Sequence, residues 1–504
     1  MRVLLQKRKN FATLKVKEVH KLPTKWGAEM VQILHLGDCH FDDAYYLNRP
    51  ELRRLLDECR EAALMAAVET AIDRQVDLFV WAGDLLDGER RISLKTRNML
   101  EQAFSELEGA KVEMAWMTGN HDPKTYLEAQ SLDQLLEAHG VHLFDGKVRE
   151  VMLKARNGMP YRLVGSGHED RGLVENRVRT YPVKADGVMT IGLLHGSVQG
   201  SATLSSGGHM GEAAELPPGL EPGDLYFPCI KADLTRLGYD LICLGHVHLP
   251  YKIEMAGAAA FYAGSLTGLS HKETGSHGAW LHTLGHGAVT SRFLELSTLE
   301  WKTVQITVTP ELSLAQFVDL VQSKTETQIS NPGLAPYLER FGNGSLVRSR
   351  SGADELSISN QRSRLMLRLS ISGVNDTILT AVRHDPETLR DRIGNAVNAA
   401  EVEIRSDMVP ERVLELQRTG DTFAAHLNTC LEDPEFMANL WAAYAQRALT
   451  FETERAERPG LDDDNGFRSG LSVEDGKAQL LEDALHDLWP RWMQLSRRMG
   501  GDQA

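Results

Sequence analysis

Short apolar runs alternate with helical patterns over the first half of the chain. Five runs have the length and composition of buried strands: residues 31–36, 77–82, 112–117, 188–194 and 241–244. Between the first two runs, Leu and Ala recur at three- and four-residue steps from Pro50 onward, and a second helical pattern covers 94–107. This alternation predicts an α/β fold in which helices cover a sheet.

The pattern changes at Trp301. Thr303–Val308 and Arg364–Ser372 look like strands, with a helical pattern at Ser313–Gln322 between them, so we expect a second, smaller α+β domain. From Pro386 the pattern is helical. The expected division is a basic N-terminal extension at 1–29, a main domain at 30–299, an α+β capping domain at 300–385, a helical region at 386–455, a linker at 456–473 and a C-terminal amphipathic helix at 474–504.

Composition is that of an ordinary globular protein, because 42% of the 504 residues are hydrophobic and 25% are charged. No apolar stretch approaches the roughly 20 residues of a membrane span, and we see no signal peptide, so a cytoplasmic location is expected. The five cysteines form no Cys-x-x-Cys pair, which fits a reducing compartment. The net charge of −15 is uneven: residues 1–30 carry +6 and residues 401–504 carry −10. A local basic path can therefore still bind a polyanion.

Ligand-type residues stand at the end of each apolar run. In chain order they are Asp38 and His40, Asp84, Asn120 with His121 and Asp122, His195, and His246 with His248. An isolated His-x-His pair is more often a surface or hydrogen-bonded pair, but five such strand ends make chance an unlikely explanation. Ligands bind at the carboxyl ends of strands in open α/β sheets, so these residues can converge.

The donor set favours transition-metal ions. Carboxylate, amide and imidazole ligands without a thiolate suit Mn, Fe or Zn better than Ca or Mg. Seven candidate ligands are too many for one ion, so we expect two divalent ions with one shared carboxylate.

In this order, the motifs Asp-x-His, Gly-Asp, Gly-Asn-His-Asp, His and Gly-His-x-His resemble those of the calcineurin-like metallophosphoesterase superfamily. The resemblance implies a four-layer α/β/β/α sandwich with 30–299 as the catalytic domain. It implies one metal on Asp38, His40, Asp84 and His248, and a second on Asp84, Asn120, His195 and His246. It also implies that His121 contacts the scissile phosphate or the leaving oxygen, and that Asp122 orients His121.

Tyr262–Trp280 contains Gly264-Ser265, Glu273-Thr-Gly and Gly278-Ala-Trp, and resembles the close of the catalytic domain in SbcD-type and YhaO-like DNA repair exonucleases. That resemblance implies a nuclease dependent on two metal ions, Mn²⁺ by expectation with Fe or Zn as alternatives, in which a metal-bridging hydroxide attacks a DNA phosphorus in line. It also implies a coiled-coil SMC-like or AAA-type ATPase partner bound through the C-terminal helices. Homodimers are common among the resembling enzymes.

One departure concerns Phe41–Leu52, which contains no histidine where double-strand-break nucleases of this group usually carry one. It weakens the expectation of duplex exonuclease action more than that of metal binding. Two alternatives stay open: a small-molecule phosphodiesterase or nucleotidase at the same dimetal site, and a non-catalytic scaffold that recruits an ATPase. His271 and His277 are expected to be solvated loop residues.

Overall fold

The computed structural model of the chain describes residues 30–47, 49–88, 90–172, 175–199, 226–255, 259–285, 287–327, 338–339 and 364–408. Apart from Val374–Asp376, these residues belong to one compact unit. The expected N-terminal extension, the linker at 456–473 and the helix at 474–504 lie outside the described residues. So does the part of the expected helical region beyond residue 408. In the described part of the chain, no helix has the length and hydropathy that crossing a bilayer requires.

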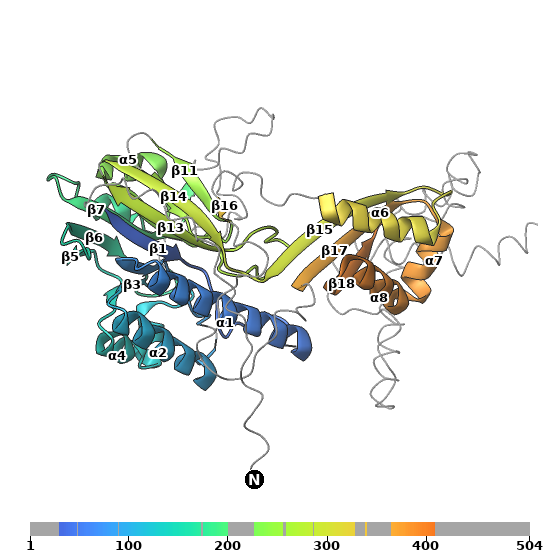
Figure 1. The fold of residues 1–504 in the computed structure, drawn as a ribbon, viewed down its shortest axis with the longest axis horizontal. Helices are drawn as coiled ribbons and strands as arrows, with labels where there is room; N and C mark the ends of the chain where they lie inside the picture. Colours follow the sequence, from blue (N-terminus) through green and yellow to red (C-terminus); the bar gives the residue numbers. More distant parts are fainter. Residues whose placement is uncertain are drawn as a thin grey trace, which may run out of the picture. The chain divides into compact units, whose positions relative to one another are not determined.

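Two sheets form the core of the main domain (Figure 1). The first has the order β16 (Leu338–Glu339), β14 (Ala288–Glu295), β13 (Gly278–Gly285), β1 (Val31–Leu36), β2 (Leu78–Trp81), β3 (Glu113–Met117) and β4 (His142–Phe144). The strands β1 to β4 run parallel, whereas β13 runs antiparallel to both β1 and β14. The chain thus returns about 250 residues later, at Leu284, to pair with Val31 at its start.

The second sheet has the order β11 (Tyr251–Glu254), β12 (Ala259–Tyr262), β10 (Leu241–Gly245), β7 (Met189–His195), β6 (Pro160–Ser166) and β5 (Arg149–Lys154). Its four central strands are parallel, and β11 and β5 are antiparallel to their neighbours. A separate short pair joins β8 (Val198–Gln199) to β9 (Cys229–Ile230). Parallel central strands bring their carboxyl ends to one edge of each sheet, where the ligand-type residues lie.

Helices cover the outer faces of both sheets (Figure 1). On the first sheet lie α1 (Pro50–Asp73), α2 (Leu94–Gly109), α3 (Lys124–Ala129) and α4 (Leu132–Ala138), and on the second lie α5 (Lys231–Leu237) and a 3₁₀ turn at Arg177–Thr180. Pro50 starts α1 with its φ already fixed, and the Ser93 hydroxyl accepts from the Thr96 amide at 3.1 Å to cap α2. The predicted four-layer α/β/β/α sandwich is confirmed.

Strand periodicity explains why these runs are apolar throughout. In β1, Leu34 and Leu36 pack among the side chains of α1 and α2, whereas Val31 and Ile33 pack against the second sheet. Successive side chains point to opposite faces, so a strand buried on both faces needs apolar residues at nearly every position. His35, on the inner face, is fully buried as well.

A third sheet follows, with the parallel order β15 (Leu299–Val308), β17 (Arg364–Gly373) and β18 (Ala399–Ser406). Its helices are α6 (Leu314–Thr327), α7 (Asp376–His384) and α8 (Pro386–Val397). Residues 399–406 were expected to be helical, and that prediction is wrong. Ala, Glu and Arg favour a helix locally, but pairing with β17 and burial of Val402 outweigh this weak preference.

An apolar cluster joins α1 to this third sheet. It consists of buried Leu52, Leu56, Cys59, Leu299, Trp301 and Met366. The Trp301 indole also donates to the carbonyl oxygen of Gly268 at 2.8 Å, and its ring stacks on Tyr46 at a centroid distance of 6.4 Å. The cluster ties the loop after the first ligand motif to the strand that begins the smaller sheet.

Candidate metal centre and active site

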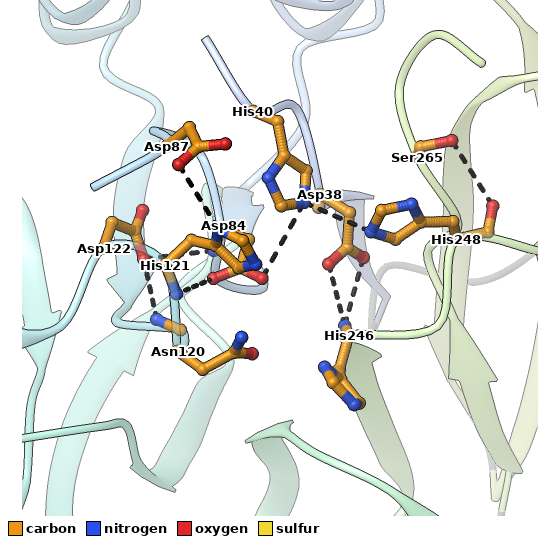
Figure 2. A network of polar contacts seen from close by, with 12 residues as sticks. Asp38, His40, Asp84, Asp87, Asn120, His121, Asp122, His246, His248 and Ser265 are labelled. Carbon is orange, nitrogen blue, oxygen red and sulfur yellow. Dashed lines mark hydrogen bonds and ion pairs between the residues drawn. The ribbon is translucent and has the colours of Figure 1, made fainter. Parts of the chain in front are cut away.

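The ligand-type residues gather where parallel strands of both sheets end. Asp38 and His40 follow β1, Asp84 follows β2, Asn120 and His121 follow β3, and His195 is the last residue of β7. His246 and His248 follow β10, so the second sheet supplies three of the imidazoles. Figure 2 shows the side chains of Asp38, His40, Asp84 and His248 gathered at one place from separate strand ends. The structure therefore brings together all seven residues that the sequence singled out as metal ligands.

One group of donors consists of Asp38, His40 and His248, whose ligand atoms all lie within 4.8 Å of one another. The Nε2 atoms of His40 and His248 face each other at 3.1 Å. The main-chain amide of His246 donates to both carboxylate oxygens of Asp38, at 2.9 and 3.1 Å, and so fixes that carboxylate between the two sheets. This trio could hold one cation.

A second group consists of Asp84, His195 and His246, with ligand atoms again within 4.8 Å. Asp84 Oδ2 lies 3.2 Å from His195 Nε2 and 3.8 Å from His40 Nε2, so one carboxylate faces both groups. Asn120 Oδ1 lies 3.1 Å from His195 Nε2. His195 Nδ1 donates to the Ala82 carbonyl oxygen at 2.7 Å, which leaves the Nε2 lone pair directed at the site.

The backbone at these residues has an uncommon conformation. Asp38, His40 and Asp84 have φ values of 49°, 49° and 48°, and His246 has a φ of 94°. Residues other than glycine rarely adopt this left-handed conformation. Such residues cluster at functional sites, where the backbone strain is stored. Gly83 also has a positive φ, and a Cβ there would lie 2.2 Å from His195 Nδ1. The glycine before Asp84 is therefore required by close approach as well as by conformation.

The charges of the site fit divalent cations. Asp38 and Asp84 are both at most 1% exposed. Burial raises the pKa of Asp38 to about 6. Burial also acts to raise the pKa of Asp84, but the neighbouring His195 and His121 hold it well below its usual value. Two buried carboxylates among imidazoles need compensating cations, and mixed nitrogen and oxygen donors suit Mn, Fe or Zn.

His121 has an oriented ring, but its partner differs from the predicted one. Its Nδ1 lies 3.4 Å from Asp87 Oδ1. The Asp122 carboxylate instead accepts from the amides of Asp84, Leu85 and Gly119, at 3.1, 2.8 and 2.7 Å. The prediction that Asp122 orients His121 is therefore wrong. Asp122 closes the backbone turn that carries Asp84, because the buried amides of Asp84, Leu85 and Gly119 need an acceptor more than the partly exposed ring of His121 does.

The pKa of His121 is raised above its usual value. Burial acts to lower it, but the carboxylates of Asp84 and Asp87 outweigh that effect. About a third of the side chain is exposed, at 33%. The ring also meets His40 edge-on, at a centroid distance of 4.7 Å. His121 is thus a partly exposed group at the rim of the two donor groups, and the neighbouring carboxylates favour its protonated form.

Sequence reasoning missed three residues around the site. Asp87 had no assigned role, although it stands between Asp84 and Gly88 in one strand-end turn. Glu273 accepts from His248 Nδ1 at 3.0 Å and from Ser265 Oγ at 2.8 Å. Its place in the segment Tyr262–Trp280 was the one feature of the sequence that could have pointed to it. Arg171 lies beside the His121 backbone: a Cβ on Gly88 would lie 2.0 Å from the His121 carbonyl oxygen and 2.9 Å from Arg171 Nη2. No local pattern marks it.

His277 was expected in solvent, and that prediction is wrong. It is 1% exposed, and its Nδ1 lies 3.0 Å from Ser265 Oγ. Its Nε2 lies 3.0 Å from the Glu273 carbonyl oxygen. His277 therefore braces the loop that places Glu273 beside His248. The sequence places His277 in a loop, and nothing in that position indicates that its side chain is buried.

Comparison with known proteins agrees with this geometry. Residues 31–250 match the family model of the calcineurin-like phosphoesterases, so this part of the chain is similar to the domains of that family. The chain is 26% identical over 294 residues to the uncharacterized metallophosphoesterase YhaO of Bacillus subtilis (strain 168). That match covers 57% of this chain and 66% of YhaO, just under two thirds of the relative's length.

Two solved structures are similar at low identity. GAP50, described as the anchor in the inner membrane complex of Plasmodium, matches with 13% identity and a TM-score of 0.34 over 53% of this chain and 85% of that one. A dimetal phosphatase from Danio rerio matches with 14% identity and a TM-score of 0.29 over 51% and 93% of the two chains. Neither likeness bears on the substrate.

Proposed function

We propose that this protein is a metal-dependent phosphodiesterase that cleaves DNA, with two Mn²⁺ ions as its expected cofactor. The observation that carries the proposal is the convergence of Asp38, His40, Asp84, Asn120, His195, His246 and His248 around one carboxylate, with His121 at the rim. Two divalent ions in such a centre polarise phosphoryl oxygens and favour deprotonation of an attacking water.

The residues of the site have separate roles in metal binding and in proton transfer. Asp38, His40 and His248 would hold one cation, and His195, Asn120 and His246 the other, with Asp84 shared. Asp87 keeps the proton on His121 Nδ1, so the ring presents Nε2 to the substrate. Protonated His121 would stabilise or protonate the leaving 3′-oxygen, as a general acid within reach of the phosphate.

Three features favour a polyanionic substrate. The exposed Arg171 has its guanidinium near Gly88 and the main chain of His121, and a guanidinium there can pair with a phosphate. The loop after Asp38 and His40 exposes Tyr45 by 53% and Leu47 by 55%, and an exposed aromatic ring can stack on a base. The segment Tyr262–Trp280, which resembles that of DNA repair exonucleases, supplies Glu273 to His248. A strand of DNA offers phosphates to the guanidinium and bases to the aromatic ring.

We also propose that an SMC-like or AAA-type coiled-coil ATPase binds this protein through residues 474–504. The apolar stripe of Leu481, Leu485, Leu488, Trp492, Leu495 and Met499 supports this partner, because an amphipathic helix can dock in an apolar groove. Deletion of 474–504 should abolish co-purification with such an ATPase and leave Mn-dependent turnover of a small phosphodiester unchanged. Retained complex formation would contradict the partner proposal alone.

The functional proposal is tested with the full chain on 3′-labelled single- and double-stranded DNA, with cyclic and mononucleotides as rival substrates. We expect cleavage of DNA with Mn²⁺ and none with EDTA. Asp84→Asn and His121→Asn should reduce the rate of DNA cleavage by at least about a hundredfold. The control Glu254→Gln, at an exposed residue of β11, should leave that rate unchanged. Unchanged activity in Asp84→Asn and His121→Asn would contradict the proposed phosphodiesterase function. Turnover of nucleotides without DNA cleavage would favour the small-molecule alternative.

A further inference from the structure

A second cluster of metal-type donors lies between the two sheets, apart from the candidate active site. His35 on β1 and His282 on β13 belong to the first sheet, and Cys243 on β10 belongs to the second. Their ligand atoms lie within 4.8 Å of one another, and all three residues are fully buried, at 0% exposure. The proposed phosphodiesterase chemistry uses none of them.

The outer nitrogen of each ring is held by an oxygen atom. His35 Nε2 lies 3.2 Å from the Leu244 carbonyl oxygen, which can only accept, so this nitrogen carries the proton. His35 Nδ1 is then a lone pair that faces His282 Nε2 at 3.3 Å. His282 Nδ1 lies 2.8 Å from Ser291 Oγ. An oxygen partner behind each imidazole is the arrangement that orients histidine ligands of metals.

The charges of the cluster favour a monovalent cation. Burial lowers the pKa of His35 to about 3 and that of His282 well below its usual value, so both rings stay neutral and able to bind a metal. Burial also raises the pKa of the Cys243 thiol, so a thiolate there needs a cation beside it. The cluster contains no carboxylate. A thiolate with a monovalent ion is neutral overall, whereas a divalent ion would leave a buried net charge.

We propose that His35, Cys243 and His282 form a binding site for Cu(I). Two imidazoles and a thiolate are a soft donor set that selects this d¹⁰ ion. A cavity of about 330 Å³ lies next to the cluster, although none of the three donors lines it. Its lining includes Ser291, which contacts His282, and Phe261, whose ring lies 4.8 Å from that of His282. Lys252 and Asp240 also line this cavity.

The same atoms allow a metal-free arrangement. Ser291 can donate to His282, His282 to His35, and His35 to the Leu244 carbonyl oxygen, which satisfies every polar group in the chain of contacts. The two arrangements differ in what Cys243 does, because the relay does not need its sulfur. A measurement that detects a copper–sulfur contact therefore separates them.

The test uses the full chain with its divalent sites filled by Mn²⁺, to which Cu(I) is added anaerobically before gel filtration. We expect about one copper per chain, and X-ray absorption at the copper edge with one sulfur and two nitrogen neighbours. In Cys243→Ala, the sulfur neighbour of copper should be absent and the affinity for Cu(I) should fall at least tenfold. The matched control is Cys229→Ala, which removes another buried cysteine outside the cluster and should bind copper as the parent does.

Two results would overturn the proposal. One is the absence of a sulfur neighbour in the unmodified protein, which would leave only the hydrogen-bonded relay. The other is a sulfur neighbour that persists in Cys243→Ala, which would place copper at another thiol such as Cys39. If Cys243→Ala fails to fold, as judged by circular dichroism, Ser291→Ala replaces it. That variant should keep the sulfur neighbour and bind about tenfold more weakly, and unchanged affinity would contradict the ligand role of His282.

Discussion

Main-chain hydrogen bonds hold the carboxylates of the candidate site and the turns that carry them. The amides of His246 and His121 donate to Asp38 and Asp84, at 2.9 and 2.8 Å, and the amides of Asp38 and His40 donate to the Gly83 and Asp84 carbonyl oxygens. Left-handed residues cost roughly 1–3 kcal/mol each, and these hydrogen bonds offset that cost. The backbone of the strand ends therefore positions the donors.

At Asp87, removal of the charge should change the pH dependence of the reaction. The carboxylate helps to raise the pKa of His121, so Asp87→Asn should lower that pKa. A general acid acts while protonated, and the rate falls as pH rises through its pKa. The descending limb of the pH–rate profile should therefore move to lower pH. An unmoved limb would remove His121 from the role of acid.

Glu273 should govern metal affinity through His248. Glu273→Gln removes the charge that orients His248 Nδ1, and loss of such a partner typically weakens metal binding by about 10- to 100-fold. Isothermal titration with Mn²⁺ measures the change, and Glu254→Gln, at an exposed residue of β11, is the control. Equal affinities in the two variants would show that Glu273 has no positioning role.

Gly119 should be irreplaceable for metal binding. A Cβ at this position would lie 2.1 Å from Asp84 Oδ1 and 2.6 Å from the Asp84 amide nitrogen, so Gly119→Ala must displace the shared carboxylate. We expect Mn²⁺ affinity to fall by at least about tenfold, because a displaced ligand no longer meets the ion in the right geometry. Gly109→Ala, where a Cβ meets nothing within 4 Å, should bind as the parent does. Equal binding by the two variants would refute the argument.

At the scale of elements, the sequence predicts the strands that bear the site because each is buried on both faces. A run such as Leu78–Trp81 has little alternative to an inner strand, and the residue after it must lie at the sheet edge. Strand β18 could not be predicted in the same way. Ala399–Ser406 is only partly buried, and its partner β17 lies outside any local window of sequence. Pairing that depends on a distant strand leaves little local pattern.

The cluster between α1 and the third sheet should contribute measurable stability. Leu56 is 2% exposed within it, and Leu→Ala at such a site typically costs about 2–5 kcal/mol. Leu56→Ala should lower the urea midpoint of unfolding, whereas Leu94→Ala, at a side chain that is 74% exposed, should change the free energy by less than about 0.5 kcal/mol. Equal midpoints would mean that the cluster is not closely packed in solution.

At the scale of the whole molecule, the sequence predicted which residues converge but not how they support one another. The motifs mark strand ends, so Asp38 and His246 could be placed at one site although they are 208 positions apart. Nothing local indicates that Asp87 rather than Asp122 faces His121, that Glu273 backs His248, or that Arg171 approaches from another loop. Those contacts depend on loop geometry that tertiary packing decides.

The arrangement of the two donor groups across both sheets is the central claim, and anomalous diffraction tests it most directly. Crystals soaked in Mn²⁺ and measured at the manganese edge should show two peaks about 3.5–4 Å apart. One should lie among Asp38, His40 and His248, and the other among Asn120, His195 and His246, with Asp84 between them. A single peak, or two peaks away from Asp84, would contradict the account.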